Sequence, residues 1–161
     1  MRPKLRRALA SVVALTGIGT ALVTGTAHAV GDLPVKIQSW NGLCLTVTDA
    51  SLGSNPVQTG CTHAHNFELD TDHNNIFVQG HPGACLADSF EGLLFIDSCS
   101  NADSVVTPDA TKTMGGLGYG RLHWHLWGDY AHANGNAQFV TMIQDPGSSL
   151  AVYWSLVIQT G

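Results

Sequence analysis

Two segments of the chain follow the same order of residue types, and each begins near a cysteine and ends at one. The first runs from Gly42-Leu43-Cys44-Leu45 through a turn-rich stretch to Cys61, and the second from Gly83-Ala84-Cys85-Leu86 to Cys99. The leading cysteines lie 41 residues apart and the closing cysteines 38. Self-similarity at such a period is typical of repeated supersecondary units. The chain is therefore predicted to be an array of similar units.

All four cysteines of the chain belong to these two segments. Four cysteines allow three pairings. If each segment is one structural unit, the economical pairing joins Cys44 to Cys61 and Cys85 to Cys99. A zinc site made by all four is the alternative, but the C-x-x-C spacing common in such sites is absent.

The first 29 residues have the pattern of a secretory signal peptide. A basic start precedes an apolar run, and Ala27-His28-Ala29 matches an A-x-A cleavage site. The run contains Thr and Gly and is short for a membrane-spanning helix. We expect residues 1–29 to be removed and a secreted, extracellular protein to begin at Val30. Arg6-Arg7 leaves a twin-arginine export route open, although the general secretory route fits better.

The remaining residues, 30–161, are numerous enough for a single domain with its own core. They keep only Lys36, Lys112 and Arg121 against 12 acidic residues, which gives a formal charge of −9. Nucleic acids and anionic membrane surfaces select for basic patches. Neither is therefore an expected partner, and we expect a monomer.

Short runs rich in β-branched and aromatic residues alternate with clusters of Gly, Asn, Asp, Pro and Ser, which predicts an all-β fold. A third unit of the same period falls on Arg121 to Gly128, with Leu126 at the position of Cys85. Asn134-Gly135-Asn136 supplies its turn, and residues 111–120 are expected to form a Gly-rich loop. Three units of four strands are thus predicted, at about residues 33–74, 75–115 and 116–161.

Three such units around a pseudo-threefold axis make a β-trefoil, and the repeated G-x-C-L strand and V-x-x-x-C segment resemble the repeats of ricin-type β-trefoil lectins. The stretch from Phe67 to Gly80 resembles the connection between those repeats. The Q-x-W signature of the family is degenerate, with His65-Asn66-Phe67 and Val152-Tyr153-Trp154 in its place. The resemblance implies that Phe67 and Trp154 supply large rings to the base of the core.

The resemblance also implies where sugars bind. Each family site has an aspartate two residues after the first cysteine, an aromatic ring two residues before the second, and an amide soon after. The carboxylate and the amide bind hydroxyl groups, and the ring stacks on the sugar. The first repeat has Thr46 and Thr59 at the first two positions and keeps only Asn66, so it is not expected to bind a sugar.

The second and third repeats contain the candidate residues. The second has Ala87 and Asp97 at the family positions, but Asp88 stands one place late and Phe90 lies in the turn. The third repeat contains aromatic rings, a carboxylate and amides close together in the sequence. Trp124 and Leu126 share one face of the expected strand, so we expect that face to pack in the core. The predicted carbohydrate-binding residues are Asp88, Phe90, Trp127, Asp129, Tyr130 and Asn136.

Seven histidines follow the signal segment, and His63 with His65 and His123 with His125 have the i, i+2 spacing that places two rings on one face of a strand. Such pairs are candidate metal ligands. The spacing is common by chance, however, and nothing in the sequence brings the pairs together. We predict no metal and no cofactor.

The sequence contains no nucleophile elbow, metalloprotease helix or phosphate loop. The predicted function is therefore a non-catalytic carbohydrate-binding module with a glycan partner. A secreted module that binds a protein, such as an inhibitor of an extracellular hydrolase, is the alternative. A small extracellular enzyme on the same scaffold is the third hypothesis.

Overall fold

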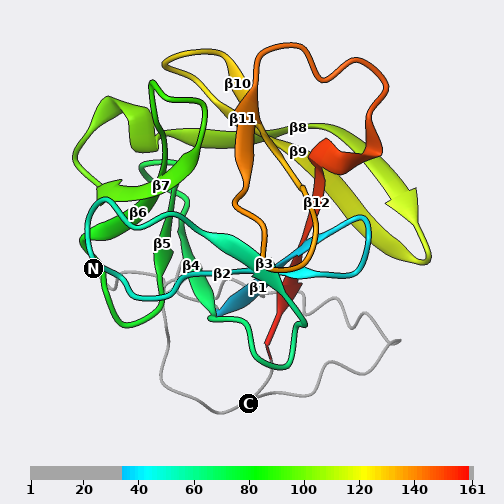
Figure 1. The fold of residues 1–161 in the computed structure, drawn as a ribbon, viewed down its shortest axis with the longest axis horizontal. Helices are drawn as coiled ribbons and strands as arrows, with labels where there is room; N and C mark the ends of the chain where they lie inside the picture. Colours follow the sequence, from blue (N-terminus) through cyan, green and yellow to red (C-terminus); the bar gives the residue numbers. More distant parts are fainter. Residues whose placement is uncertain (1–33, 160–161) are drawn as a thin grey trace, which may run out of the picture.

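The computed structural model describes residues 34–159, so the predicted signal peptide lies outside the described residues. This part of the chain is built from twelve strands and two short 3₁₀ helices, without an α-helix (Figure 1). None of its helices is long and apolar enough to cross a membrane. The elements are β1 (Val35–Ser39), β2 (Cys44–Thr46), β3 (Val57–Thr59), β4 (Phe67–Asp70), β5 (Asn75–Val78), β6 (Ala84–Asp88), β7 (Leu94–Ser98), η1 (Ala102–Ser104), β8 (Val106–Met114), β9 (Leu117–Trp124), β10 (Asp129–His132), β11 (Thr141–Ile143), η2 (Leu150–Val152) and β12 (Tyr153–Ile158).

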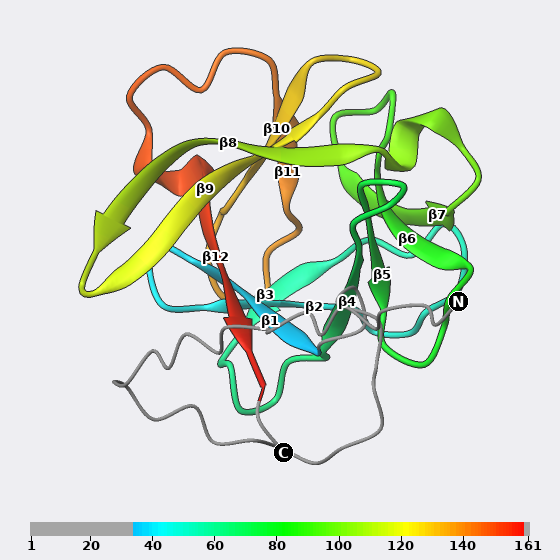
Figure 2. The ribbon, with the colours of Figure 1, turned by 180° about the vertical axis from the view of Figure 1, so that it is seen from behind.

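Six strands form a barrel. β1 pairs with β12 and with β4, β4 pairs with β5, and β9 pairs with β8 and with β12, all antiparallel. The gap between β5 and β8 is bridged where the Val106 N–H donates to the Asn74 carbonyl at 2.8 Å. The circle of strands is visible from behind in Figure 2.

The other six strands form three hairpins: β2 with β3, β6 with β7, and β10 with β11. Each hairpin is inserted between two consecutive barrel strands, so the chain is divided into three four-stranded units. We refer to β1–β4, β5–β8 and β9–β12 as the first, second and third units. This arrangement confirms the predicted β-trefoil.

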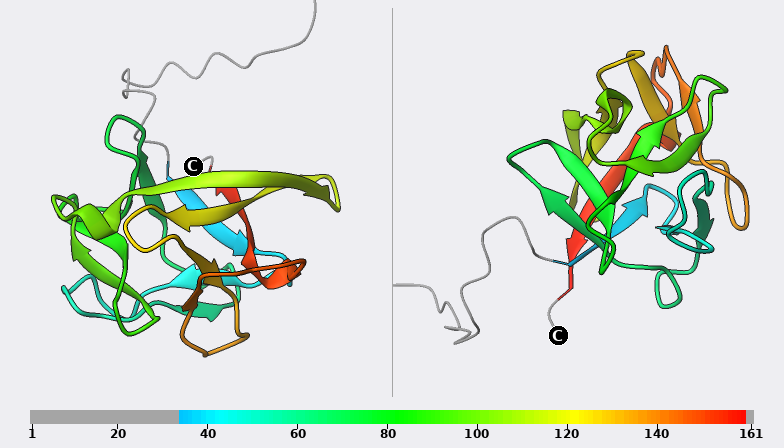
Figure 3. Two further views of the ribbon diagram at one scale, coloured as in Figure 1. Left: turned by 90° about the horizontal axis from the view of Figure 1, so that it is seen from above. Right: turned by 90° about the vertical axis from the view of Figure 1, so that its left-hand side faces the viewer.

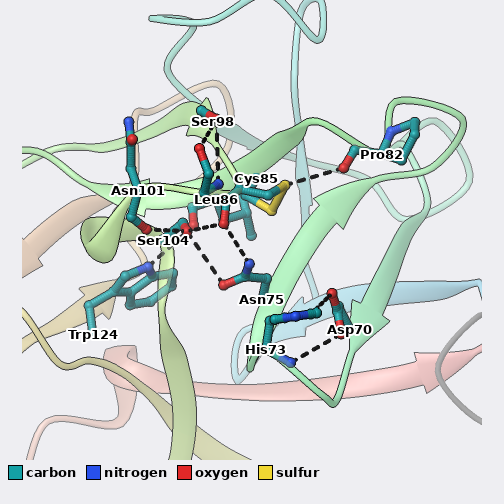
Figure 4. The surroundings of a disulfide bond; sticks show 12 residues. Asp70, His73, Asn75, Pro82, Cys85, Leu86, Ser98, Asn101, Ser104 and Trp124 are labelled. Atoms are coloured by element: carbon teal, nitrogen blue, oxygen red, sulfur yellow. Dashed lines mark hydrogen bonds and ion pairs between the residues drawn. A yellow bond between two sulfur atoms is a disulfide. The ribbon is translucent and has the colours of Figure 1, made fainter.

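The core lies where the three units meet, and large rings fill it. Phe67 and Trp154 are both almost fully buried, which agrees with the positions that the resemblance gave them. Trp124 is also fully buried and donates its indole N–H to the Leu86 carbonyl at 3.4 Å (Figure 4). Trp154 donates to the Ala131 carbonyl at 2.9 Å. Trp124 therefore bonds across a unit boundary and Trp154 within the third unit, and the indole N–H of each is satisfied.

Both predicted disulfides are present, Cys44–Cys61 in the first unit and Cys85–Cys99 in the second. Each joins the first strand of a hairpin to the residues that follow its second strand. The second disulfide is tied to the barrel by Asn75, whose side-chain amide donates to the Cys99 carbonyl at 2.9 Å (Figure 4).

The third unit differs from the sequence prediction in two respects. Residues 111–120 are not a loop: β8 and β9 extend as one long hairpin around Gly115 and Gly116, which have φ of 57° and 82° (Figure 3). Glycine is the residue that takes this left-handed conformation at low cost, so the two glycines form the turn and leave the flanking residues free to pair.

The strand expected through Leu126 was also wrong. β9 ends at Trp124, and Leu126 lies exposed in a turn instead of packing beside Trp124. Strand register shows that Tyr130, opposite His123, occupies the place of Cys44 and Cys85. Its ring stacks on that of His123 with centroids 4.6 Å apart, so an aromatic pair lies where the other units have a disulfide.

Candidate functional site

The turn between β6 and β7 presents an aromatic ring to solvent. β6 ends at Asp88, and the Gly92 N–H donates back to the Ser89 carbonyl at 3.0 Å. Gly92 has φ of 74°, which permits this tight turn. The Ser89 hydroxyl accepts the Leu93 N–H at 3.1 Å. Phe90 consequently stands at the tip of the hairpin with 88% of its surface exposed.

A second turn, between β9 and β10, presents another ring. The Gly128 N–H donates to the Trp124 carbonyl at 3.1 Å, and Gly128 has φ of 76°. Trp124 before the turn is buried, whereas Trp127 within it is 46% exposed. β10 then begins with Asp129, which lies opposite Trp124 in the strand register.

Backbone hydrogen bonds hold these two units together. The Met142 N–H of β11 donates to the Gly92 carbonyl at 2.8 Å, and the Leu94 N–H of β7 donates to the Val140 carbonyl at 2.9 Å. The rings of Phe90 and Trp127 meet edge to face, with centroids 5.8 Å apart and an interplanar angle of 67°. This is a favourable geometry for two aromatic rings.

A pocket of about 130 Å³ lies beside the two rings, and we call it the Phe90–Trp127 pocket. Aromatic rings, a carboxylate, a hydroxyl and an amide line it. Its lining residues are Ser89, Phe90, Gly92, Trp127, Asp129 and Gln144. The pocket thus lies between the second and third units and draws on both.

Two carboxylates lie buried at this boundary. Asp88 is 1% exposed and Asp129 is 8% exposed, and both oxygens of Asp88 and the Oδ1 of Asp129 have no hydrogen-bonding partner among the described residues. Burial, then the negative charges of Asp129 and Asp103, raise the pKa of Asp88 to about 7. Burial also raises the pKa of Asp129, while the adjacent Asp88 carboxyl and then His123 oppose this rise. A proton shared by the two carboxyl groups would leave the pair with one negative charge.

Three of the six predicted binding residues therefore line the pocket, Phe90, Trp127 and Asp129, and a fourth, Asp88, is buried beside Asp129. The sequence suggested two separate sites, one in each repeat, and the fold brings their residues to a shared boundary. Ser89, Gly92 and Gln144 were not predicted. Gln144 directly follows β11, and only a correct alignment of the third unit places that strand end beside the turn at Gly92.

The other two predicted residues lie elsewhere. The hydroxyl of Tyr130 donates to Asp109 at 3.2 Å, and the Arg121 guanidinium lies 4.8 Å from its ring centroid. Asn136 forms a bridge with Gln58 of the first unit. Neither residue lines the Phe90–Trp127 pocket.

The residues at the family's own sugar-binding positions are engaged within the protein. Thr46 hydrogen-bonds His65 through its hydroxyl and Nδ1 at 2.9 Å. Ala87 is fully buried. Asp97 accepts a hydrogen bond from Asn101 at 2.6 Å. The Phe90–Trp127 pocket is thus built from residues outside those positions.

The histidine pairs do not come together as one site. His125 hydrogen-bonds Thr107 at 2.7 Å, His123 stacks on Tyr130, and His65 is bound to Thr46. Among residues 34–159, no group of three or more His, Cys, Asp or Glu side chains is placed to hold a metal ion.

Larger hollows lie on other parts of the surface, and two of them exceed 400 Å³. One, of about 470 Å³, is lined mainly by polar residues around the first disulfide, including Lys36, Gln38 and Asn66. The other, of about 490 Å³, lies between the long β8–β9 hairpin and β12 and is lined by Tyr119 and Trp154 among others. Neither combines exposed aromatic rings with a buried carboxylate.

Comparisons with protein-family models and with curated protein sequences gave no match. Solved structures do match. The hemolytic lectin CEL-III has a TM-score of 0.65 at 12% identity over 80% of this chain, and the chain spans 33% of that protein. The β-trefoil lectin of the Vibrio vulnificus hemolysin/cytolysin, solved with N-acetyl-D-lactosamine bound, has a TM-score of 0.57 at 18% identity, covering 81% of this chain and 97% of the lectin. SeviL, solved with the asialo-GM1 saccharide, has a TM-score of 0.56 at 13% identity, covering 80% and 99%.

The chain spans half or less of the larger proteins that it matches, lysenin and CEL-III among them. At these identities the likeness shows a shared fold, the β-trefoil. Function has to be argued from the site itself.

Proposed function

We propose that the protein is a secreted, non-catalytic carbohydrate-binding module that binds glycans at the Phe90–Trp127 pocket. The observation that carries this proposal is the exposed pair of rings beside the buried carboxylate of Asp129, whose Oδ1 lacks a partner among the described residues. Rings stack on the apolar face of a sugar, and carboxylate oxygens accept hydrogen bonds from its hydroxyl groups. The N-terminal sequence supports secretion, and the lectins that share the fold make glycans a reasonable ligand class.

The size of the pocket indicates how a glycan would sit. Pockets that enclose a drug-sized ligand measure roughly 300–1,000 Å³. A pocket of about 130 Å³ accepts one substituent, while the sugar ring lies outside on Trp127. Gln144, at the rim, is exposed and offers an amide to the polar edge of the ligand.

A glycan array with the oxidised protein, followed by titration calorimetry on the best ligands, tests the proposal. The variant is Trp127→Ala, and the matched control is Trp40→Ala. Trp40 is 44% exposed and lies in the corresponding turn of the first unit, before Gly42 with φ of 83°. Binding that Trp127→Ala removes and Trp40→Ala retains would support the site. A folded protein that binds no glycan would refute it and favour a protein partner, to be sought among co-secreted hydrolases.

A further inference from the structure

The buried polar groups of the Phe90–Trp127 pocket are hydrogen-bond acceptors. Asp129 lines the pocket with a buried carboxylate whose Oδ1 has no partner among the described residues, and the Ser89 hydroxyl accepts the Leu93 N–H. Asp88 is buried beside Asp129 but does not itself line the pocket. Carboxylates buried without partners are costly. A ligand that brings donor hydrogens, and above all a positive charge, would relieve that cost.

The charges that surround these carboxylates are mostly negative. Asp103 of η1 lies near Asp88, and the rise in the pKa of Asp129 is opposed by the adjacent Asp88 carboxyl and by His123 of β9. Residues 34–159 contain three lysine or arginine side chains, and each contacts another group. Lys36 donates to the Ala64 carbonyl, Lys112 lies over the Tyr153 ring, and Arg121 pairs with the Asp109 carboxylate. None of the three lines the pocket. The site therefore lacks a cation of its own.

The aromatic rings favour the same kind of ligand. Trp127 and Phe90 both line the pocket, and both rings are open to solvent. The face of an aromatic ring attracts a cation, most strongly in the case of tryptophan. Ring faces next to a carboxylate are a common means of recognising an ammonium group. The small volume of the pocket suits a group of that size.

We propose that the Phe90–Trp127 pocket selects sugars that carry a free, protonated amine, such as 2-amino-2-deoxy sugars without the acetyl group. The ammonium lies between Asp129 and the ring of Trp127, and the sugar ring rests on the indole. This inference rests on the proposed carbohydrate-binding function and names the ligand class of the same site. Acetylation of the amine removes both its charge and two of its donor hydrogens, so the acetylated sugar should bind more weakly.

The test compares two ligands that differ only at the amine: a short glucosamine oligosaccharide and its fully N-acetylated counterpart. Titration calorimetry near neutral pH with the wild-type protein should show about tenfold tighter binding of the free amine. Asp129→Asn should abolish the preference for the free amine, and Trp127→Ala should weaken the binding of both oligosaccharides. Glu91→Gln is the control, because Glu91 is exposed next to Phe90 but does not line the pocket.

Equal binding of the two oligosaccharides, or tighter binding of the acetylated one, would overturn the amine inference. If that binding still required Trp127, the carbohydrate proposal would stand. Absence of binding by either oligosaccharide and by every glycan on the array would defeat both proposals. A short lysine peptide that competes equally well with the amino sugar would also overturn the inference, because it would show attraction to the acidic surface rather than recognition of a sugar amine.

Discussion

Phe90 and Trp127 come from different units of the trefoil, and their rings meet edge to face with centroids 5.8 Å apart. Because both rings are exposed, the contact contributes little to the core. Phe90→Ala should lower the free energy of unfolding by no more than about 0.5–1.5 kcal/mol, the worth of an aromatic pair. It should weaken glycan binding severalfold, because Trp127 loses the ring that holds its orientation.

Urea unfolding and titration calorimetry check both expectations. Phe139→Ala is the control, since Phe139 is 53% exposed and does not line the pocket. A loss of stability near that of a core phenylalanine, about 3–5 kcal/mol, would contradict the prediction.

Asp88 should make the stability of the protein depend on pH. Its ordinary pKa of 3.8 is raised to about 7 in the folded protein, first by burial and then by Asp129 and Asp103. The folded state therefore binds this proton more tightly than the unfolded state. The free energy of unfolding contributed by Asp88 is fully present below about pH 4, falls as the pH rises from about 4 to 7, and is lost above that range.

Asp88→Asn removes this titration. The unfolding free energy of the variant relative to that of the wild type should rise between about pH 4 and pH 7, measured by urea unfolding at a series of pH values. Asp145→Asn, at an exposed position, should leave the wild-type profile unchanged. Parallel curves for wild type and Asp88→Asn would show that Asp88 ionises normally.

The repeated cysteine segments and the turn glycines were sufficient to predict the all-β trefoil and the two disulfides, because each depends on local spacing. The third unit was harder. Its stacked Tyr130 and His123 occupy the place of a disulfide, so no cysteine marked the register, and counting from Cys85 gave Leu126 instead of Tyr130. The glycines of residues 111–120 suggested a loop, but β8 and β9 form a hairpin there.

The candidate site was predictable as a set of residues but not as a place. Asp88 and Phe90 stand out in the second repeat, and Trp127 and Asp129 in the third. Their meeting depends on contacts far apart in sequence, such as the hydrogen bond from the Met142 N–H to the Gly92 carbonyl. No periodicity of the sequence encodes that contact. Gln144 lines the pocket through the same kind of long-range contact, so it could not be predicted from the sequence.

Gln58 links the first and third units through buried hydrogen bonds. Its side chain is fully buried, donates to the Ser39 hydroxyl at 2.7 Å and accepts the Gly135 N–H at 2.8 Å. Gln58→Leu leaves the Gly135 N–H without this acceptor. The expected loss is about 1–3 kcal/mol of unfolding free energy for each buried polar group that loses its partner, measured by urea unfolding. Gln138→Leu, at an exposed position, should change stability little. Equal effects of the two substitutions would contradict the assignment.

The two disulfides should contribute nearly equally to stability. They close segments with sequence separations of 17 and 14, and each should be worth about 3 kcal/mol in the chain-entropy account. The double substitutions Cys44→Ala with Cys61→Ala, and Cys85→Ala with Cys99→Ala, test this by urea unfolding under non-reducing conditions. A much larger loss for the second pair would indicate that the Asn75 hydrogen bond to the Cys99 carbonyl depends on that disulfide.

A substitution at Tyr130 tests whether this residue has a structural role or a ligand-binding role. Its ring lies between His123 and Arg121, and its hydroxyl donates to Asp109 at 3.2 Å, away from the lining of the Phe90–Trp127 pocket. Tyr130→Phe keeps the stacked ring and removes only the hydroxyl. The expected result is a loss of about 0.5–1.5 kcal/mol in unfolding free energy with unchanged glycan affinity. Titration calorimetry on Tyr130→Phe and on Trp127→Ala compares their glycan affinities. A fall in affinity as large as that of Trp127→Ala, with stability preserved, would mean that the ligand reaches the third unit's own hairpin and that Tyr130 contacts it.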